Sequence, residues 1–216
     1  MSTRIRRAAT RAAALASVGA AALALSACSS GENPGPAAPW ATAKLIAADG
    51  ADAGTVEFAD APGGTLVTVH ATGLAPGFHG MHLHEIGLCE PDSVAPGGGE
   101  PGAFLSSGGH IAGDHGEHHH AGEGVPRQPG QPTVGHAGDL PPLLVREDGT
   151  ADLSVVTNRV TRELLMDADG SAVIVHEGAD NFGNVPERYA PQGPDADTVK
   201  TGDAGGRALC GVVDEA

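Results

Sequence analysis

The sequence has little positive charge, few cysteines and no long membrane-spanning apolar stretch. Its 216 residues include 12 Lys and Arg against 27 Asp and Glu, a formal net charge of −15. Such an acidic chain lacks the basic surface that binds nucleic acid, so we expect no nucleic-acid partner. The apolar run within residues 1–27 is too short and too weakly flanked for a spanning helix.

Residues 1–27 have the composition of a secretory signal, with four arginines, an Ala/Leu-rich run and no acidic residue. They end in Leu25-Ser26-Ala27-Cys28, which resembles the processing site of bacterial lipoproteins. We expect Cys28 to become the lipidated N-terminus, with several acyl chains, palmitate among them, because one chain anchors only marginally. The alternative is an ordinary cleaved signal, with Cys28 lost or free. Removing residues 1–27 takes the formal net charge from −15 to −19.

The rest of the chain divides into a tether and one domain. Residues 28–39 are rich in Ser, Gly, Pro and Ala, which is typical of a flexible linker, and residues 40–216 have the length of a single domain. If Cys28 is lipidated, Cys89 and Cys210 are left as a pair. Because disulfides persist in exported proteins, a Cys89–Cys210 bridge is the simplest expectation.

Eight short segments have the β-forming residues or alternating polarity of strands. They are residues 41–48, 54–59, 65–71, 78–84, 143–146, 151–156, 172–176 and 208–213. Between the fifth and sixth, Glu147-Asp148-Gly149-Thr150 predicts a hairpin. The pattern predicts an all-β, eight-stranded antiparallel Greek-key barrel or sandwich, with a short helix over residues 161–167.

Two long Gly- and Pro-rich segments, residues 85–142 and 178–206, interrupt the strands. Loops of this length in a compact domain are usually functional or disordered, and binding residues often lie on loops held by a rigid scaffold. We therefore predict that both are functional loops.

Several histidines lie in settings that suit metal binding. His82 and His84 are two apart in an alternating run, so on a strand both imidazoles share one face. His110 follows two glycines, which permit close backbone approach, and His176 ends a predicted strand. Four imidazoles in a tetragonal arrangement suit Cu(II). His136 and Asp139 are three apart in a loop and suit tetrahedral Zn²⁺.

These segments together resemble the copper,zinc superoxide dismutase family over residues 44–213. The resemblance rests on Gly77-Phe78-His79-Gly80-Met81-His82-Leu83-His84-Glu85, Gly109-His110, His136-Ala137-Gly138-Asp139-Leu140, Val175-His176-Glu177-Gly178-Ala179-Asp180 and residues 201–213. It implies an immunoglobulin-like sandwich and an enzyme that converts two superoxide radicals and two protons to dioxygen and hydrogen peroxide by cycling Cu(II) and Cu(I). With export, it implies protection of the cell envelope from extracellular superoxide.

The resemblance also implies roles for individual residues. Copper would be held by His82, His84, His110 and His176, and zinc by His110, His119, His136 and Asp139, with His110 bridging the two metals. Asp180 would orient a copper ligand and a zinc ligand through hydrogen bonds. Arg207 would dock superoxide, His110 would carry a proton, Thr201 would narrow the channel and Lys200 would add positive field. His79 matches a structural position rather than a ligand.

Three points stay open. The third zinc histidine falls in a run that offers His115, His118, His119 and His120, of which we favour His119 from its spacing after His110. Phe182 and Tyr189 are scarce aromatics that either form a subunit contact, giving a homodimer, or pack inside their loop. The alternative function is a non-catalytic copper- and zinc-binding lipoprotein for metal scavenging or storage.

Overall fold

The computed structural model describes residues 37–112 and 136–216. Cys28 and the histidine run from His115 to His120 lie outside this part of the chain. None of the helices in the two described ranges is both long and apolar enough to cross a membrane.

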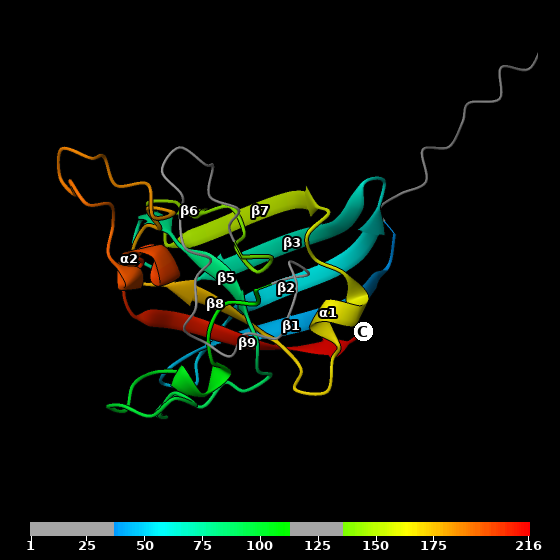
Figure 1. Ribbon diagram of the computed structural model, residues 1–216. Coiled ribbons are helices and arrows are strands. Elements are labelled where there is room, and N and C mark those ends of the chain that lie inside the picture. The colour runs from blue at the N-terminus through cyan, green and yellow to red at the C-terminus, as the bar shows by residue number, and fades with distance from the viewer. Residues whose placement is uncertain (1–36, 113–135) are drawn as a thin grey trace, which may run out of the picture. The chain divides into compact units, whose positions relative to one another are not determined.

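A seven-stranded antiparallel sheet forms most of the fold, and a two-stranded sheet lies beside it (Figure 1). The order in the larger sheet is β5-β8-β9-β1-β2-β3-β7, and β4 pairs with β6 in the smaller one. The strands are β1 Pro39–Ala47, β2 Asp52–Ala61, β3 Gly64–Thr72, β4 Gly77–His79, β5 Met81–His84, β6 Leu143–Val145, β7 Thr150–Thr157, β8 Ala172–His176 and β9 Arg207–Glu215. The predicted all-β antiparallel barrel or sandwich is confirmed.

Alternating burial along the strands builds one main core. In β3, Val67 and Val69 are buried while Leu66 and Thr68 are partly exposed, as expected for a strand with one covered face. Phe58 of β2 packs against Trp40 of β1, with ring centroids 5.8 Å apart. Most buried apolar residues belong to this one cluster.

The predicted strand over residues 78–84 is interrupted at Gly80. The Gly80 N–H donates to the carbonyl of Gly178, and its carbonyl accepts from His176, so its backbone is bonded outside a regular ladder. The chain therefore changes from β4 to β5 at this point. The described residues contain nine strands where the pattern predicted eight, because one predicted strand is divided.

The predicted hairpin between residues 143–146 and 151–156 is wrong in its pairing. The turn forms, with the Arg146 N–H donating to Thr150 at 2.8 Å. However, β6 pairs with β4 and β7 pairs with β3. Leu143 and Val145 of β6 are buried in the smaller sheet, and the chain enters β7 of the larger sheet directly after the turn. The turn thus connects the two sheets.

Short helices lie in the connections. The helix expected over residues 161–167 is present as α1, Arg162–Leu165, with the Thr161 hydroxyl capping the Leu164 N–H. The pattern missed α2, Ala196–Thr201, and a 3₁₀ turn over Leu105–Ser107. The disulfide Cys89–Cys210 joins the first long loop to β9, with Cα atoms 5.6 Å apart.

Two segments of the first long loop, residues 109–111 and 138–140, pair with the outer edge of β5. Leu83 donates to the Gly138 carbonyl at 2.9 Å, and Ile111 donates to the Leu83 carbonyl at 2.9 Å. Isolated bridges place His110 opposite His84 and Asp139 opposite His82. This backbone register brings loop residues beside the strand histidines.

Candidate metal centre

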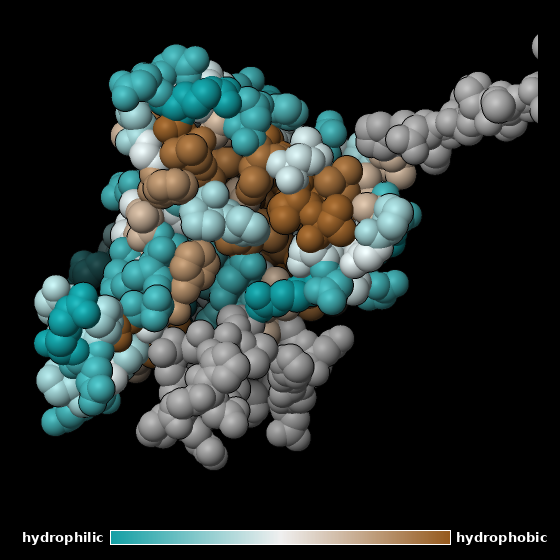
Figure 2. Space-filling model, turned by 90° about the horizontal axis from the view of Figure 1, so that it is seen from above, coloured by the Kyte–Doolittle hydropathy of each residue, from teal (hydrophilic) through white to brown (hydrophobic). Residues whose placement is uncertain are grey.

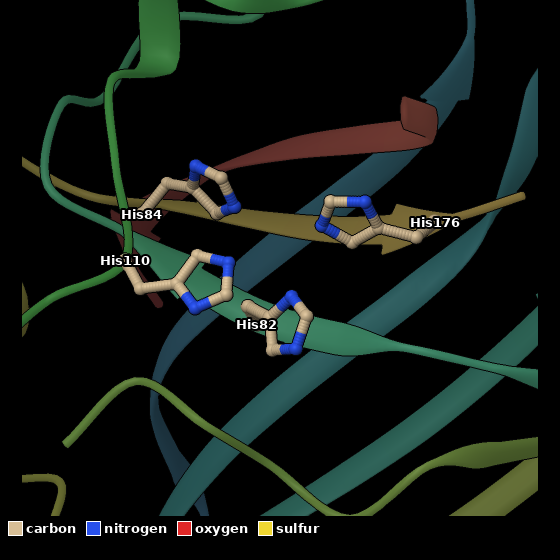
Figure 3. A group of neighbouring side chains, drawn as sticks. All are labelled: His82, His84, His110 and His176. Atoms are coloured by element: carbon tan, nitrogen blue, oxygen red, sulfur yellow. The ribbon is translucent and has the colours of Figure 1, made fainter. Parts of the chain in front are cut away.

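Four histidines from β5, β8 and the first long loop meet at one point. His82, His84, His110 and His176 each offer a ring nitrogen within 4.8 Å of the others. Their rings converge on a common centre (Figure 3). His82 and His84 come from the same face of β5, as their spacing predicted, while β8 supplies His176.

Hydrogen bonds fix one nitrogen of three of these rings and leave the other available. His84 donates through Nδ1 to the Gly108 carbonyl at 2.9 Å, and His176 through Nδ1 to the Gly205 carbonyl at 3.1 Å. His82 donates through Nε2 to Asp180 Oδ2 at 2.6 Å.

The opposite nitrogens, His82 Nδ1, His84 Nε2 and His176 Nε2, are buried without a hydrogen-bond partner among the described residues. Buried polar atoms are normally paired, so three such nitrogens in one group require an explanation. A neutral imidazole that donates through one nitrogen carries a lone pair on the other. The arrangement therefore fits a metal ion held by histidine, and the donor set suits copper.

Burial keeps the imidazoles of His84 and His176 neutral, the form that binds a metal. Burial, and then the neighbouring charge of His82, lowers the pKa of His176 to about 4. Burial followed by the charge of Arg207 lowers the pKa of His84 well below its ordinary value. Because a metal binds the neutral ring, these shifts remove proton competition at neutral pH.

A second group shares His110 with the first. His110, His136 and Asp139 each offer one ligand atom within 4.8 Å of the others. His110 Nδ1 lies 3.0 Å from Asp139 Oδ1, and His136 donates its backbone N–H to Asp139 Oδ2 at 2.8 Å. Burial raises the pKa of the Asp139 carboxyl, but hydrogen bonds from His110 and His136 outweigh it and lower that pKa overall. An ionised carboxylate and two imidazoles fit three of the four ligands of a zinc site.

Arg207, at the start of β9, lies beside the four-histidine group. Its Nη1 donates to the Phe104 carbonyl at 2.6 Å and to Ser107 Oγ at 2.9 Å, and its Nη2 donates to the Gly108 carbonyl at 2.6 Å. Gly108 thus accepts from both Arg207 and His84. Burial lowers the pKa of Arg207 to about 10, so the guanidinium stays cationic at neutral pH.

Other residues singled out in the sequence lie outside the two metal-capable groups. His79 is buried, with its ring nitrogens 2.7 and 2.8 Å from the carbonyls of His176 and Ala75. Lys200 and Thr201 are exposed at the end of α2.

Sequence reasoning missed two residues that support the site. Ser107 contacts Arg207, although the two are 100 positions apart and no local pattern links them. Gly202 has φ +61°, and a Cβ there would overlap the carboxylate of Asp180. Gly202 follows α2, and glycine is common directly after a helix, so its position was a local signal. Its closeness to Asp180 gave no such signal in the sequence.

Comparisons with known proteins agree with this geometry. The family model described as copper/zinc superoxide dismutase matches residues 52–213. "Superoxide dismutase [Cu-Zn]" of Mycobacterium tuberculosis is 44% identical over 190 residues, covering 84% of this chain and 73% of that protein. The protein of the same name from Deinococcus radiodurans is 34% identical over 175 residues, covering 81% of this chain and 84% of that protein.

Solved structures give the same result. The Cu/Zn superoxide dismutase from Brucella abortus superposes with a TM-score of 0.56 at 30% identity, covering 80% of this chain and 98% of that one. A SOD-like protein from Bacillus subtilis gives a TM-score of 0.55 at 27% identity, covering 79% of this chain and 96% of that one. The fold and the two histidine groups define a dinuclear metalloprotein of the β-sandwich class. The chain belongs to the copper/zinc superoxide dismutase family.

Proposed function

We propose that this chain is a superoxide dismutase that uses copper and zinc. The observation that carries the proposal is the position of Arg207 beside the four converging histidines. The Gly108 carbonyl accepts hydrogen bonds from both Arg207 and His84, and so holds this cation next to the group. His82, His84, His110 and His176 would hold copper. His110, His136, Asp139 and one histidine outside the described residues, His119 by spacing, would hold zinc.

When bound, copper supplies the one-electron chemistry that converts two superoxide radicals and two protons to dioxygen and hydrogen peroxide. Arg207 attracts and orients the superoxide anion. The chain is strongly acidic overall, so this attraction has to be local.

His110 is the residue proposed to deliver a proton. Its Nδ1 faces Asp139, which leaves Nε2 for the four-histidine group. Nε2 would hold that proton only while it is not a copper ligand, and would then pass it to the reduced oxygen species. Asp180 holds His82 in one tautomer, with the proton on Nε2 and the lone pair on Nδ1.

Metal analysis with a superoxide-consumption assay tests this function. We expect one copper and one zinc ion per mature chain, together with fast dismutation. Metal binding without dismutation would instead support the non-catalytic scavenging or storage lipoprotein. Family membership and the presence of Arg207 beside the copper histidines favour the enzyme.

We further propose that the enzyme is exported and lipid-anchored through Cys28 to the outer face of the bacterial cytoplasmic membrane or cell envelope. The signal-like residues 1–27 support this, and the Cys89–Cys210 disulfide suits an oxidising compartment. Labelling with a palmitate analogue should mark the native chain but not Cys28→Ser. Equal labelling of both chains would exclude this anchor.

A homodimer is the proposed assembly. Phe182 and Tyr189 are 46% and 72% exposed, so neither is buried inside its loop. The face of the molecule shown in Figure 2 also carries an apolar patch with polar residues on either side. Sedimentation of the metal-loaded chain at micromolar concentration should give twice the monomer mass, and a monomer would refute the dimer.

A further inference from the structure

The guanidinium of Arg207 is held by three acceptors on one short segment. Nη1 contacts the Phe104 carbonyl and Ser107 Oγ, and Nη2 contacts the Gly108 carbonyl, at 2.6, 2.9 and 2.6 Å. Ser107 is fully buried, and its hydroxyl donates to the Phe104 carbonyl at 3.0 Å. A serine hydroxyl both donates and accepts, so Ser107 can link the carbonyl and the guanidinium at once.

These contacts leave one edge of the guanidinium available. The group has five N–H donors, and three hydrogens are used by the segment. Arg207 makes no other hydrogen bond within the described residues, so the Nε hydrogen and one Nη2 hydrogen remain. Two parallel N–H groups of this kind form a fork that suits a small anion.

The carbonyl contacts alone do not fix the direction of this fork. Two contacts leave the planar group some freedom to tilt, and a third acceptor on Nη1 restricts that motion further. Ser107 Oγ supplies the third contact. The Phe104 carbonyl is itself fixed, because Phe104 is fully buried at φ 58° among Ala172, Ile174 and Cys210. Only the serine side chain in this clamp can be removed without altering the backbone.

We propose that Ser107 is a positioning residue for anion docking, which aims the free edge of the Arg207 guanidinium at an anion bound beside the copper histidines. This inference rests on the proposed function, since it assigns Ser107 to the same anion site. It predicts that the hydroxyl affects anion affinity while metal binding stays unchanged.

Ser106 provides a matched control. It is the adjacent serine and is also buried, but its hydroxyl has no hydrogen-bond partner among the described residues. Ser106→Ala and Ser107→Ala remove the same atom from the same turn, and only Ser107→Ala removes a contact with Arg207.

The main measurement is azide binding to the copper- and zinc-loaded chain, followed by its visible absorption spectrum. We expect Ser107→Ala to raise the azide Kd about fivefold, the effect of roughly one hydrogen bond, and Ser106→Ala to leave it unchanged. Copper content should match in both variants, although Ser107→Ala, which loses two buried hydrogen bonds, should unfold at a lower urea concentration than Ser106→Ala. An unchanged azide Kd in Ser107→Ala, or an equal rise in Ser106→Ala, would overturn the inference.

A second measurement on the metal-free chain separates this inference from the proposed function. With ¹⁵N-labelled arginine, the Arg207 Nη hydrogens of the native chain should give separate NMR signals, because the clamp slows rotation of the group. Ser107→Ala should merge them, and Ser106→Ala should not. Separate signals in the metal-free native chain, with no dismutation after copper and zinc are loaded, would refute the proposed function alone. Separate signals in Ser107→Ala would refute the clamp alone.

Discussion

His82 and Asp180 form a buried pair, with His82 Nε2 donating to Asp180 Oδ2 at 2.6 Å and the two side chains 0% and 5% exposed. The carboxylate fixes which ring nitrogen carries the proton, and so directs Nδ1 at the other histidines. Residues 98 positions apart in the chain thus set the orientation of one proposed ligand.

Removing this carboxylate should weaken copper binding. Asp180→Ala is expected to lower copper affinity by about 10- to 100-fold, the usual effect of losing a partner that orients a histidine ligand. Competition with a chelator measures the affinity. Asp92→Ala, which removes an exposed carboxylate, is the control and should bind copper as the native chain does. Equal affinities in the two variants would refute the orienting role.

Copper binding should also depend on the space that Gly202 leaves for the Asp180 carboxylate. In Gly202→Ala the new methyl group would overlap the Asp180 carboxylate, so we expect loss of copper affinity as well as stability. Gly73→Ala is the matched control, since Gly73 also has positive φ but open space around its Cβ position. It should cost only about 1 kcal/mol of backbone strain and leave copper affinity intact. Urea unfolding and chelator competition together measure both effects, and equal copper affinities would argue against the overlap.

Reversing the charge of the docking residue should slow dismutation. Arg207→Glu is expected to lower the second-order rate constant by at least about tenfold with copper still bound, because the anion then meets a like charge. Lys44→Glu, the same charge change on exposed β1, should have little effect. The comparison is made at low ionic strength, where screening is weakest. A second-order rate constant in Arg207→Glu equal to that of the native chain would refute the docking role of Arg207.

Zinc content should identify the last zinc ligand. We expect His119→Ala to lose zinc while His115→Ala, His118→Ala and His120→Ala retain it, since spacing after His110 favours His119. Elemental analysis of the four variants decides between them. Loss of zinc in a different variant would reassign the ligand.

Acid should destabilise the metal-free chain. The pKa of His176 is lowered from 6.5 to about 4 in the folded state, first by burial, so the unfolded chain binds more protons between these values. Stability from this group is therefore present above pH 6.5 and is lost as the pH falls toward 4, by about 3 kcal/mol. Urea unfolding across this range should show the loss, and His176→Gln should reduce the slope. An identical slope in both chains would contradict the assignment.

Local patterns predicted most of the strands, and long-range contacts account for the errors. Ala172–His176 was predicted with its observed bounds, because its apolar run is buried on both faces. The division at Gly80 depends on hydrogen bonds to Gly178 and His176, almost a hundred residues away. The pairing of β6 with β4 rather than β7 likewise depends on a distant strand. α2 was missed although Asp195 caps it, since six residues give little periodicity.

The residues of the candidate site could be predicted where their type and spacing in the sequence indicate metal binding. His82 and His84 share a strand face by spacing alone, and the structure brings them together with His110 and His176. The orientation of the rings was not predictable, because it depends on carbonyls of Gly108 and Gly205 that any residue could supply. Ser107 gave no signal because its role is a contact with a distant arginine.

The pairing of loop residues 109–111 and 138–140 with the edge of β5 has a consequence for association between chains. An uncovered strand edge presents free N–H and C=O groups that recruit strands from other molecules. Here the segments that carry His110 and Asp139 occupy those groups. Ligands that hold the two segments in place would also shield the edge, so the metal-loaded chain should resist the intermolecular β-pairing to which a chain with loosened loops is open.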